Sequence, residues 1–185
     1  VFQQDMPLSS VEAHDGFDAD IFDPFCDHLM VIDCFDGSVV GTYRLMPEAS
    51  ARANRGFFHE TEFHGPTLYD LPGEILEVGR AAVLPRYRDR GVISLLWHGL
   101  CVYLVTRQFS YFFGLCSMPA GQKAPRPSSV HRYLMANYVS PAGFITEPLD
   151  DYRFKASSDG DEIEFRDLPT LFKGYLRLGA RLVGP

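Results

Sequence analysis

The sequence predicts an α/β fold, formed by a single domain over residues 1–185, and three observations point to it. Residues 75–84 are a nearly continuous apolar run ended by a proline, which is typical of a strand buried on both faces. A helical pattern follows over 91–108. Earlier in the chain, the β-rich stretches 28–35 and 38–46 are joined by Asp-Gly, the strongest short-range signal of a β-hairpin. The length suffices for one domain with a sizeable core.

Acidic side chains crowd the N-terminal 28 residues, with only two histidines as possible cations. Their spacing does not fit a calcium loop, which needs alternating ligands around a glycine and a closing glutamate. Two interpretations stay open: a solvated loop, or one or two carboxylates that hold a cationic amine. Arg44 lies among apolar residues of the second hairpin strand, so its charge needs a partner. That partner belongs either to a structural ion pair or to a site.

The other predicted elements are shorter. We expect a helical turn over 48–53, a buried strand over 111–117, a helix over 130–138 with Ser128 or Ser129 as its N-cap, and an amphipathic helical pattern over 168–182. Between them, residues 48–70 are polar and contain His59 and His64. These histidines are five apart, which suits neither a helical nor a strand pair of zinc ligands, so no metal site is expected.

Composition and charge limit the classes of function that the chain can have. The net charge of −7 argues against a general nucleic-acid binder. Most of the 17 basic residues are arginines, the residue suited to bidentate binding of phosphate or carboxylate. The four cysteines include no Cys-x-x-Cys pair, which favours buried reduced thiols in a cytoplasmic protein. The longest apolar run, 92–105, is too short to cross a bilayer.

A basic loop separates the predicted strand over 75–84 from the predicted helix. It carries Arg86, Arg88 and Arg90, and the helix begins at Gly91 and Val92. Free backbone N–H groups and the helix dipole make such a helix start a ready anion site. The plainer interpretation is a solvated basic turn.

Two charged residues interrupt the apolar strand, and their spacing poses a geometric question. Glu77 and Arg80 have opposite parity, so in a regular strand they face opposite sides of the sheet. Gly79 between them is a suitable place for a β-bulge, which would turn both to one face. Either a bulge brings both to a cleft, or only Glu77 reaches it and Arg80 is structural.

Four segments carry a resemblance to a known family. They are FDPFCDHLMV (22–31), VVGTYRLMP (39–47), LEVGRAAVLPRYR (76–88) and LFKGYLRLGA (171–180). In order and content they resemble the GNAT-type N-acyltransferases, in the hemolysin-like branch that contains the ornithine N-acyltransferases of ornithine-lipid synthesis. Residues 77–80 resemble the Glu-x-x-Arg of acyl-homoserine-lactone synthases. Residues 88–91 resemble a reduced pyrophosphate loop in which Ile93 replaces the second glycine.

The resemblance implies a fold and a set of site residues. The fold is a GNAT-like mixed twisted sheet flanked by helices, with a V-shaped cleft between two central strands. Glu77 and Arg80 are the implied catalytic residues, with Glu77 as the base. The donor-binding residues are Arg86, Arg88, Arg90, Gly91 and Val92. The implied substrate-binding residues are Asp23, Asp27 and Arg44, although Asp23 and Asp27 stand four apart where the family's two acidic residues stand three apart.

The same resemblance implies an activity and its partners. It is transfer of a (3-hydroxy) fatty acyl group from the phosphopantetheine thioester of acyl carrier protein, or from acyl-CoA, to the α-amine of an ornithine-like amino acid, with no tightly bound cofactor. Lys173, Arg177 and Arg181, four apart on one helix face, are either a solvated face or a patch for the carrier or for anionic headgroups at the inner membrane surface.

Two alternatives remain open. The first is another long-chain N-acyl amino acid synthase or a lactone synthase, and the segment 171–180 does not resemble the lactone synthases. The second is a non-catalytic module that binds an acyl carrier or lipid. Such a module would keep the basic loop and lose the base, so the presence of Glu77 speaks against it.

Overall fold

The structure, a computed structural model, describes residues 19–64, 68–117, 125–140, 146–153 and 161–184. Its backbone contacts group the chain into two compact units. The first unit contains Val1–Phe58 and Leu71–Leu115, and the second contains His59–Asp70 and Cys116–Pro185. We describe each unit by itself, and the single domain over residues 1–185 stays a prediction.

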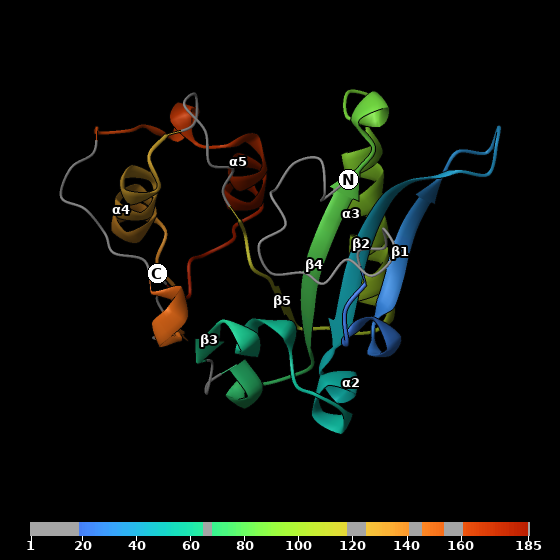
Figure 1. The fold of residues 1–185 in the computed structure, drawn as a ribbon, viewed down its shortest axis with the longest axis horizontal. Coiled ribbons are helices and arrows are strands. Elements are labelled where there is room, and N and C mark those ends of the chain that lie inside the picture. Colours follow the sequence, from blue (N-terminus) through green and yellow to red (C-terminus); the bar gives the residue numbers. More distant parts are fainter. Residues whose placement is uncertain (1–18, 65–67, 118–124, 141–145, 154–160, 185) are drawn as a thin grey trace. The chain divides into compact units, whose positions relative to one another are not determined.

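The first unit is built on a four-stranded mixed sheet, in which β1, β2 and β4 run side by side (Figure 1). Its strands are β1 (Asp27–Ile32), β2 (Val39–Pro47), β4 (Ile75–Val83) and β5 (Tyr111–Phe113), in the order β1-β2-β4-β5. The first two pairings are antiparallel, while β4 and β5 are parallel. The predicted hairpin and the predicted central strand are both confirmed. The strand predicted over 111–117 is shorter than expected.

A hydrogen-bonded turn closes the hairpin. The N–H of Asp33 donates to the Ser38 carbonyl oxygen, and the N–H of Gly37 donates to that of Asp33. Gly37 has a φ of 74°, a conformation that costs glycine little because it has no Cβ. Strand pairing therefore stops short of the central Asp-Gly, and the connection runs over 33–38.

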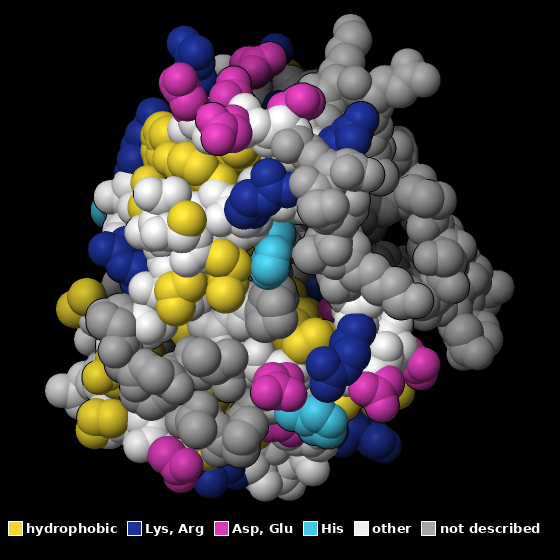
Figure 2. Space-filling model, turned by 90° about the vertical axis from the view of Figure 1, so that its left-hand side faces the viewer, with side chains coloured by type: hydrophobic (Ala, Val, Ile, Leu, Met, Phe, Trp, Pro, Cys, Tyr) yellow, Lys and Arg dark blue, Asp and Glu magenta, His cyan; other side chains and the backbone are white. Residues whose placement is uncertain are grey.

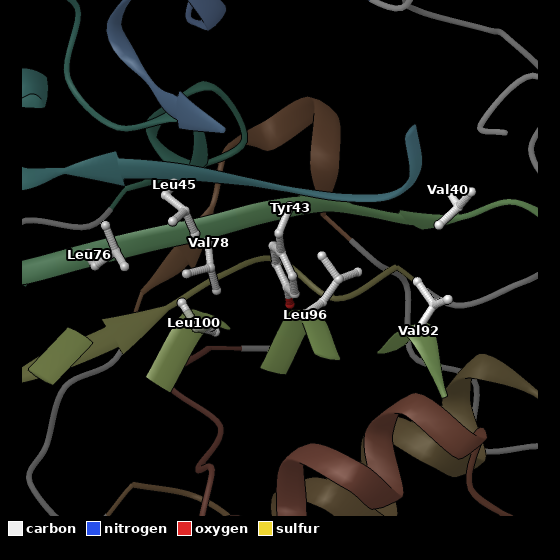
Figure 3. Packing of buried hydrophobic residues seen from close by; sticks show 8 residues of the cluster. All are labelled: Val40, Tyr43, Leu45, Leu76, Val78, Val92, Leu96 and Leu100. Carbon is white, nitrogen blue, oxygen red and sulfur yellow. The ribbon is translucent and has the colours of Figure 1, made fainter. Parts of the chain in front are cut away.

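One face of the sheet is covered by α3 (Val92–Thr106), the helix predicted over 91–108. Figure 3 shows side chains of β2 and β4 meeting those of the helix. The packed set is Val40, Tyr43, Leu45, Leu76, Val78, Val92, Leu96 and Leu100. Gly41 permits the close approach, since a Cβ there would lie 2.6 Å from Val92 Cγ1. Because the core packs tightly, it holds β4 rigid, including the side chains that β4 presents on the sheet face away from α3.

At one end of the sheet, α2 (Glu48–Ala53) follows β2 directly. It is the helical turn predicted for these residues. The buried Glu48 accepts a hydrogen bond from the N–H of Ile75 at 3.3 Å and pairs with Arg52 at 2.6 Å. The start of β4 is thus tied to the end of β2 by a side chain as well as by the strand ladder.

The second unit contains α4 (Pro127–Asn137), α5 (Thr170–Arg177) and a two-stranded antiparallel pair, β3 (Phe63–His64) with β6 (Glu147–Pro148). Val130, Leu134 and Leu168 form its core cluster. The helix predicted over 130–138 begins earlier, at Pro127, where proline suits a first helical position. Of the predicted basic trio, Lys173 and Arg177 lie on α5, while Arg181 follows its end.

Some surface features complete the description. All four cysteines are free, as predicted, but Cys34, Cys101 and Cys116 are exposed rather than buried. On the face in Figure 2, the described basic and acidic side chains are interspersed. In the described ranges, no helix is both long and apolar enough to span a membrane.

Candidate functional site

The site begins with a β-bulge in the central strand. On β2, Thr42 and Arg44 are two residues apart, but their partners on β4, Ala82 and Gly79, are three apart. One extra residue is therefore inserted in β4. At this bulge the backbone of Arg80 is unusual, since its φ of 52° lies in the left-handed region. A non-glycine residue there costs about 1 kcal/mol or more and persists only where its surroundings hold it, often at functional sites.

Ion pairs hold Arg80 in this conformation. Arg80 Nη2 lies 2.9 Å from Asp20 Oδ2, and the same oxygen lies 2.6 Å from Arg44 Nη1. Arg44 Nη1 also lies 2.9 Å from Asp23 Oδ1. The segment before β1 is thereby fastened to β2 and β4 by one carboxylate that both arginines share.

Phe58 brings Glu77 into the same group. Its backbone N–H donates to Glu77 Oε2 at 2.6 Å. The guanidinium carbons of Arg44 and Arg80 lie 5.1 and 5.8 Å from the centre of its ring. Arg44 and Glu77 are on the sheet face opposite α3, because Leu45 and Val78, their neighbours in sequence, belong to the core beneath the helix. Glu77 and Arg80 thus both contact Phe58, one through its backbone N–H and the other through its ring, with a bulge of the kind the sequence suggested, one residue beyond Gly79.

We call this group the acidic–arginine cluster: Asp20, Asp23, Arg44, Glu77 and Arg80. Arg44 and Glu77 are 6% and 5% exposed, so their charges lie in poor contact with water. Burial alone would raise the pKa of Asp20, but hydrogen bonds from Arg44 and the Phe22 backbone, with the charges of Arg44 and Arg80, lower it. Among these five described residues there are three carboxylates and two guanidinium groups, which leaves one formal negative charge in excess. A partly buried excess of this sign favours a cation as ligand.

The cluster lies where two strands part. The parallel ladder between β4 and β5 pairs Ile75 with Tyr111 and ends at Glu77 and Phe113, while β4 continues to Val83. Ligands of open sheets gather where neighbouring strands diverge. Glu77 is therefore the last paired residue before the divergence.

The basic loop follows directly after β4. Pro85–Tyr87 form a short 3₁₀ turn, and Gly91, with a φ of 75°, is the N-cap of α3. Arg88 Nε donates to the Val83 carbonyl oxygen at 3.3 Å. The first N–H groups of a helix have no partner within it, so those of Val92 and Ile93 point out of the helix end, whereas the Ser94 N–H already donates to the Gly91 carbonyl oxygen. The five predicted donor-binding residues thus run from the loop after β4 to the first residue of α3.

Comparison with known proteins identifies the fold family. Residues 1–98, more than half of the chain, match the family model described as an acetyltransferase (GNAT) domain. The chain belongs to the GNAT acetyltransferase-domain family. The GNAT-like α/β fold, a mixed sheet with helices, is thereby confirmed.

Curated relatives match over nearly the whole chain. L-ornithine N(alpha)-acyltransferase from Agrobacterium fabrum (strain C58) is 34% identical, covering 95% of this chain and 63% of that protein. The proteins of the same name from Brucella abortus (strain 2308) and Rhizobium meliloti (strain 1021) are 31% and 33% identical, covering 94% and 88% of this chain and 66% and 59% of theirs. The chain thus spans somewhat less than two thirds of these relatives.

Solved structures show a more distant likeness. Glucosamine-6-phosphate N-acetyltransferase from Arabidopsis thaliana aligns with a TM-score of 0.35 and 11% identity, over 72% of this chain and 68% of that one. The likeness is too distant to add to the family assignment.

Asp27 does not belong to the acidic–arginine cluster. It pairs across the hairpin with Leu45, which places it on the α3 side of the sheet, and its carboxylate accepts a hydrogen bond from the hydroxyl of Tyr103. Asp20 stands where Asp27 was expected, beside Asp23 and against Arg44. The sequence contained the signal, since Asp20 and Asp23 are three apart, the spacing of the family's acidic pair. Phe58 was also missed, and no sequence pattern marks it.

The described residues of the chain contain no group of three or more His, Cys, Asp and Glu side chains that could hold a metal ion. His59 is 2% exposed and lies in the short 3₁₀ turn Phe58–Thr61, whereas His64 is exposed on β3. The basic residues of α5 make local contacts: Lys173 Nζ donates to the Arg166 carbonyl oxygen, and Arg177 lies over the ring of Phe165. A carrier or lipid role for them stays a prediction.

Proposed function

We propose that this chain catalyses transfer of a fatty acyl group, in the first place a 3-hydroxy fatty acyl group, from acyl carrier protein to the α-amine of ornithine. The observation that carries the proposal is the convergence of Glu77, Arg80 and Arg44 at the point where β4 and β5 part. Three relatives named as ornithine N(alpha)-acyltransferases support the choice of substrate.

In this proposal the acidic–arginine cluster binds the amino acid. Its excess of one carboxylate favours the cationic ammonium groups of ornithine, and its two guanidinium groups suit the substrate carboxylate. Asp20 and Asp23 hold Arg44 in place, and both arginines lie against the ring of Phe58. The cluster would thus select for an amino acid with a second amine by charge balance.

The donor's phosphate binds the loop that follows β4. Arg86, Arg88 and Arg90 supply guanidinium groups, and Gly91 and Val92 supply backbone N–H groups at the start of α3. A phosphopantetheine arm carries one phosphate, and an acidic carrier protein would add further contacts to the arginines. An acyl-CoA would present the same chemistry, so the loop alone does not choose between the two donors.

The chemistry needs a base rather than an enzyme nucleophile. The α-amine must lose a proton, and Glu77 accepts it, directly or through one water. The amine nitrogen forms a bond to the thioester carbonyl carbon, and a backbone N–H of β4 near Ala82 and Val83 stabilises the oxyanion, since the Leu84 N–H already donates to the Val40 carbonyl oxygen. When the tetrahedral intermediate collapses, the C–S bond breaks and the nitrogen gives its second proton to the departing thiolate, so that the carrier leaves as a thiol and a neutral amide remains. Every bond change involves substrates and Glu77, so the reaction requires no bound cofactor or metal.

The test offers the protein a 3-hydroxyacyl thioester of acyl carrier protein, or the matching acyl-CoA, with a panel of amino acids. Mass spectrometry then detects new amides. The proposal expects N-acyl ornithine with the carrier donor and weaker product from amino acids that have no second amine. If an amide forms only with another amino acid, the activity is that of a different N-acyl amino acid synthase. Carrier binding without any amide would support the non-catalytic module.

A further inference from the structure

Tyr87 lies at the centre of the donor loop and is not itself one of its charged groups. The guanidinium carbons of Arg86 and Arg90 lie 5.0 and 5.4 Å from the centre of its ring. Both distances fall within the range of cation–π attraction. One half-buried ring therefore supports two of the three arginines of the loop.

Hydrogen bonds of its side chain and backbone, together with core packing, hold Tyr87 in place. Its hydroxyl donates to Asp33 Oδ2 at 2.6 Å, which ties the donor loop to the hairpin connection. Its own N–H donates to the Leu84 carbonyl oxygen at 2.8 Å, and its carbonyl oxygen accepts from the N–H of Arg90 at 3.1 Å. The side chain also packs against the core beneath α3. The bond from Tyr87 is the main cause that lowers the pKa of Asp33, so this contact favours the ionised carboxylate.

The guanidinium groups of Arg86 and Arg90 are available to bind a ligand. Over the ranges that the structure describes, the guanidinium groups of Arg86 and Arg90 form neither a hydrogen bond nor an ion pair, and both residues are exposed. An arginine side chain loses considerable rotamer entropy when a ligand fixes it. A ring that stacks two guanidinium groups in advance reduces this cost while leaving their N–H donors to the ligand.

We infer that Tyr87 is a positioning residue that holds Arg86 and Arg90 in place for the phosphate of the acyl donor. The inference rests on the proposed function, because it takes the loop as the donor site. Tyr87 itself touches neither reacting group in this account and acts through the two arginines.

The test measures KM and kcat of Tyr87→Leu, with the carrier thioester as the varied substrate. We expect KM to rise about tenfold, the order that follows from losing two exposed cation–π contacts, while kcat stays within about twofold. Tyr87→Phe keeps the ring and should keep most of the donor affinity. Should Tyr87→Leu fold poorly, Tyr87→Met retains packing volume without the ring, and the same KM shift is expected.

The chain offers a matched control in Tyr103. It too donates its hydroxyl to an aspartate, Asp27, and carries an arginine over its ring, with Arg107 at 5.6 Å. It packs against the same core from the far end of α3. Tyr103→Leu should therefore lower the melting temperature as Tyr87→Leu does and leave the donor KM unchanged. A donor KM raised equally by both variants would overturn the inference, since it would reflect general loosening of the fold.

A double-mutant cycle separates this inference from the proposed function. In a variant with Arg86→Ala and Arg90→Ala, adding Tyr87→Leu should raise the donor KM no further, because the arginines it positions are gone. An added increase of similar size would mean that Tyr87 acts independently of them, and the positioning role would be lost. If the two arginine substitutions alone leave the donor KM unchanged, the donor site itself is misplaced. If the donor KM is raised in the arginine variant but unchanged in Tyr87→Leu, the donor site stands and only the positioning role of Tyr87 is refuted.

Discussion

Replacing Glu77 with Gln is the most informative single change in the candidate site. Gln keeps the shape of the side chain, and its carbonyl oxygen can still accept the hydrogen bond that the Phe58 N–H makes to Glu77 Oε2 at 2.6 Å. What it loses is the charge and the ability to take a proton from the substrate amine. The variant therefore separates catalysis from structure better than a truncation to Ala.

The magnitudes of the two effects differ. A hydrogen bond to a charged acceptor is worth about 1–1.5 kcal/mol more than a neutral one, so stability should fall by about that amount. For a chain of this size that is a loss of roughly 3–5 °C in melting temperature. General-base catalysis is worth about a hundredfold or more in rate, so kcat should fall by at least that factor, or about 3 kcal/mol.

The assay measures kcat against pH with carrier thioester and ornithine, together with a thermal melt. An α-amine has a pKa of about 8, so at neutral pH most of it is protonated and attack depends on the base. Raising the pH supplies free amine from solution and should partly rescue the variant. Donor KM should change little, because the proposed phosphate site is the loop beyond β4.

Glu48 provides the matched control. It is also a buried glutamate that accepts a backbone N–H, from Ile75, but it lies on α2 and pairs with Arg52. Glu48→Gln should lower the melting temperature to a similar degree and leave kcat unchanged. A stably folded Glu77→Gln protein with wild-type kcat at neutral pH would refute the assignment of Glu77 as the base.

Three further predictions concern the arginines and Asp20. Arg88→Ala with Arg90→Ala should raise donor KM more than it lowers kcat, and carrier binding should lose part of its salt dependence; equal salt dependence in variant and wild type would contradict the donor role. Arg80→Gly should melt about 2–4 °C above Arg80→Ala, because glycine tolerates the φ of 52° that strains alanine, and equal melting temperatures would argue against the strain. The folded-state pKa of Asp20 lies below its ordinary value of 3.8, so its ion pairs stabilise the fold above about pH 4 and are lost as the pH falls through that folded value. Melting temperature should then fall more steeply below about pH 4 in the wild type than in Asp20→Asn, and parallel curves would contradict it.

Much of the first unit could be predicted from periodicity and turn chemistry. The apolar run that became β4, the helix behind the basic loop and the Asp-Gly hairpin each carry a local signal that tertiary contacts did not override. The strand at Tyr111–Phe113 is shorter than its apolar run because only three residues find partners on β4 before the two strands part. Strand length at such a point depends on the neighbouring strand, which the sequence of one segment does not contain.

The site was harder to predict, because it depends on register. Once Asp27 pairs with Leu45 it must face the helix, whereas Arg44, one residue earlier on β2, faces away from it. Only the register distinguishes Asp27 from Asp20 as the partner of Arg44. Likewise the bulge was expected from Gly79, yet the strained backbone falls on Arg80, which its ion pair with Asp20 holds in place. Long-range contacts of this kind are not visible in local sequence.

The most direct test of the central claim is the product that the purified protein makes from 3-hydroxyacyl carrier protein and ornithine. Tandem mass spectrometry of that product distinguishes an amide at the α-amine from one at the side-chain amine. We expect the α-amide, formed by wild type and by Glu48→Gln at similar rates and by Glu77→Gln at about one hundredth of that rate or less. The absence of any amide from the wild type, or an α-amide made equally well by Glu77→Gln, would contradict this expectation.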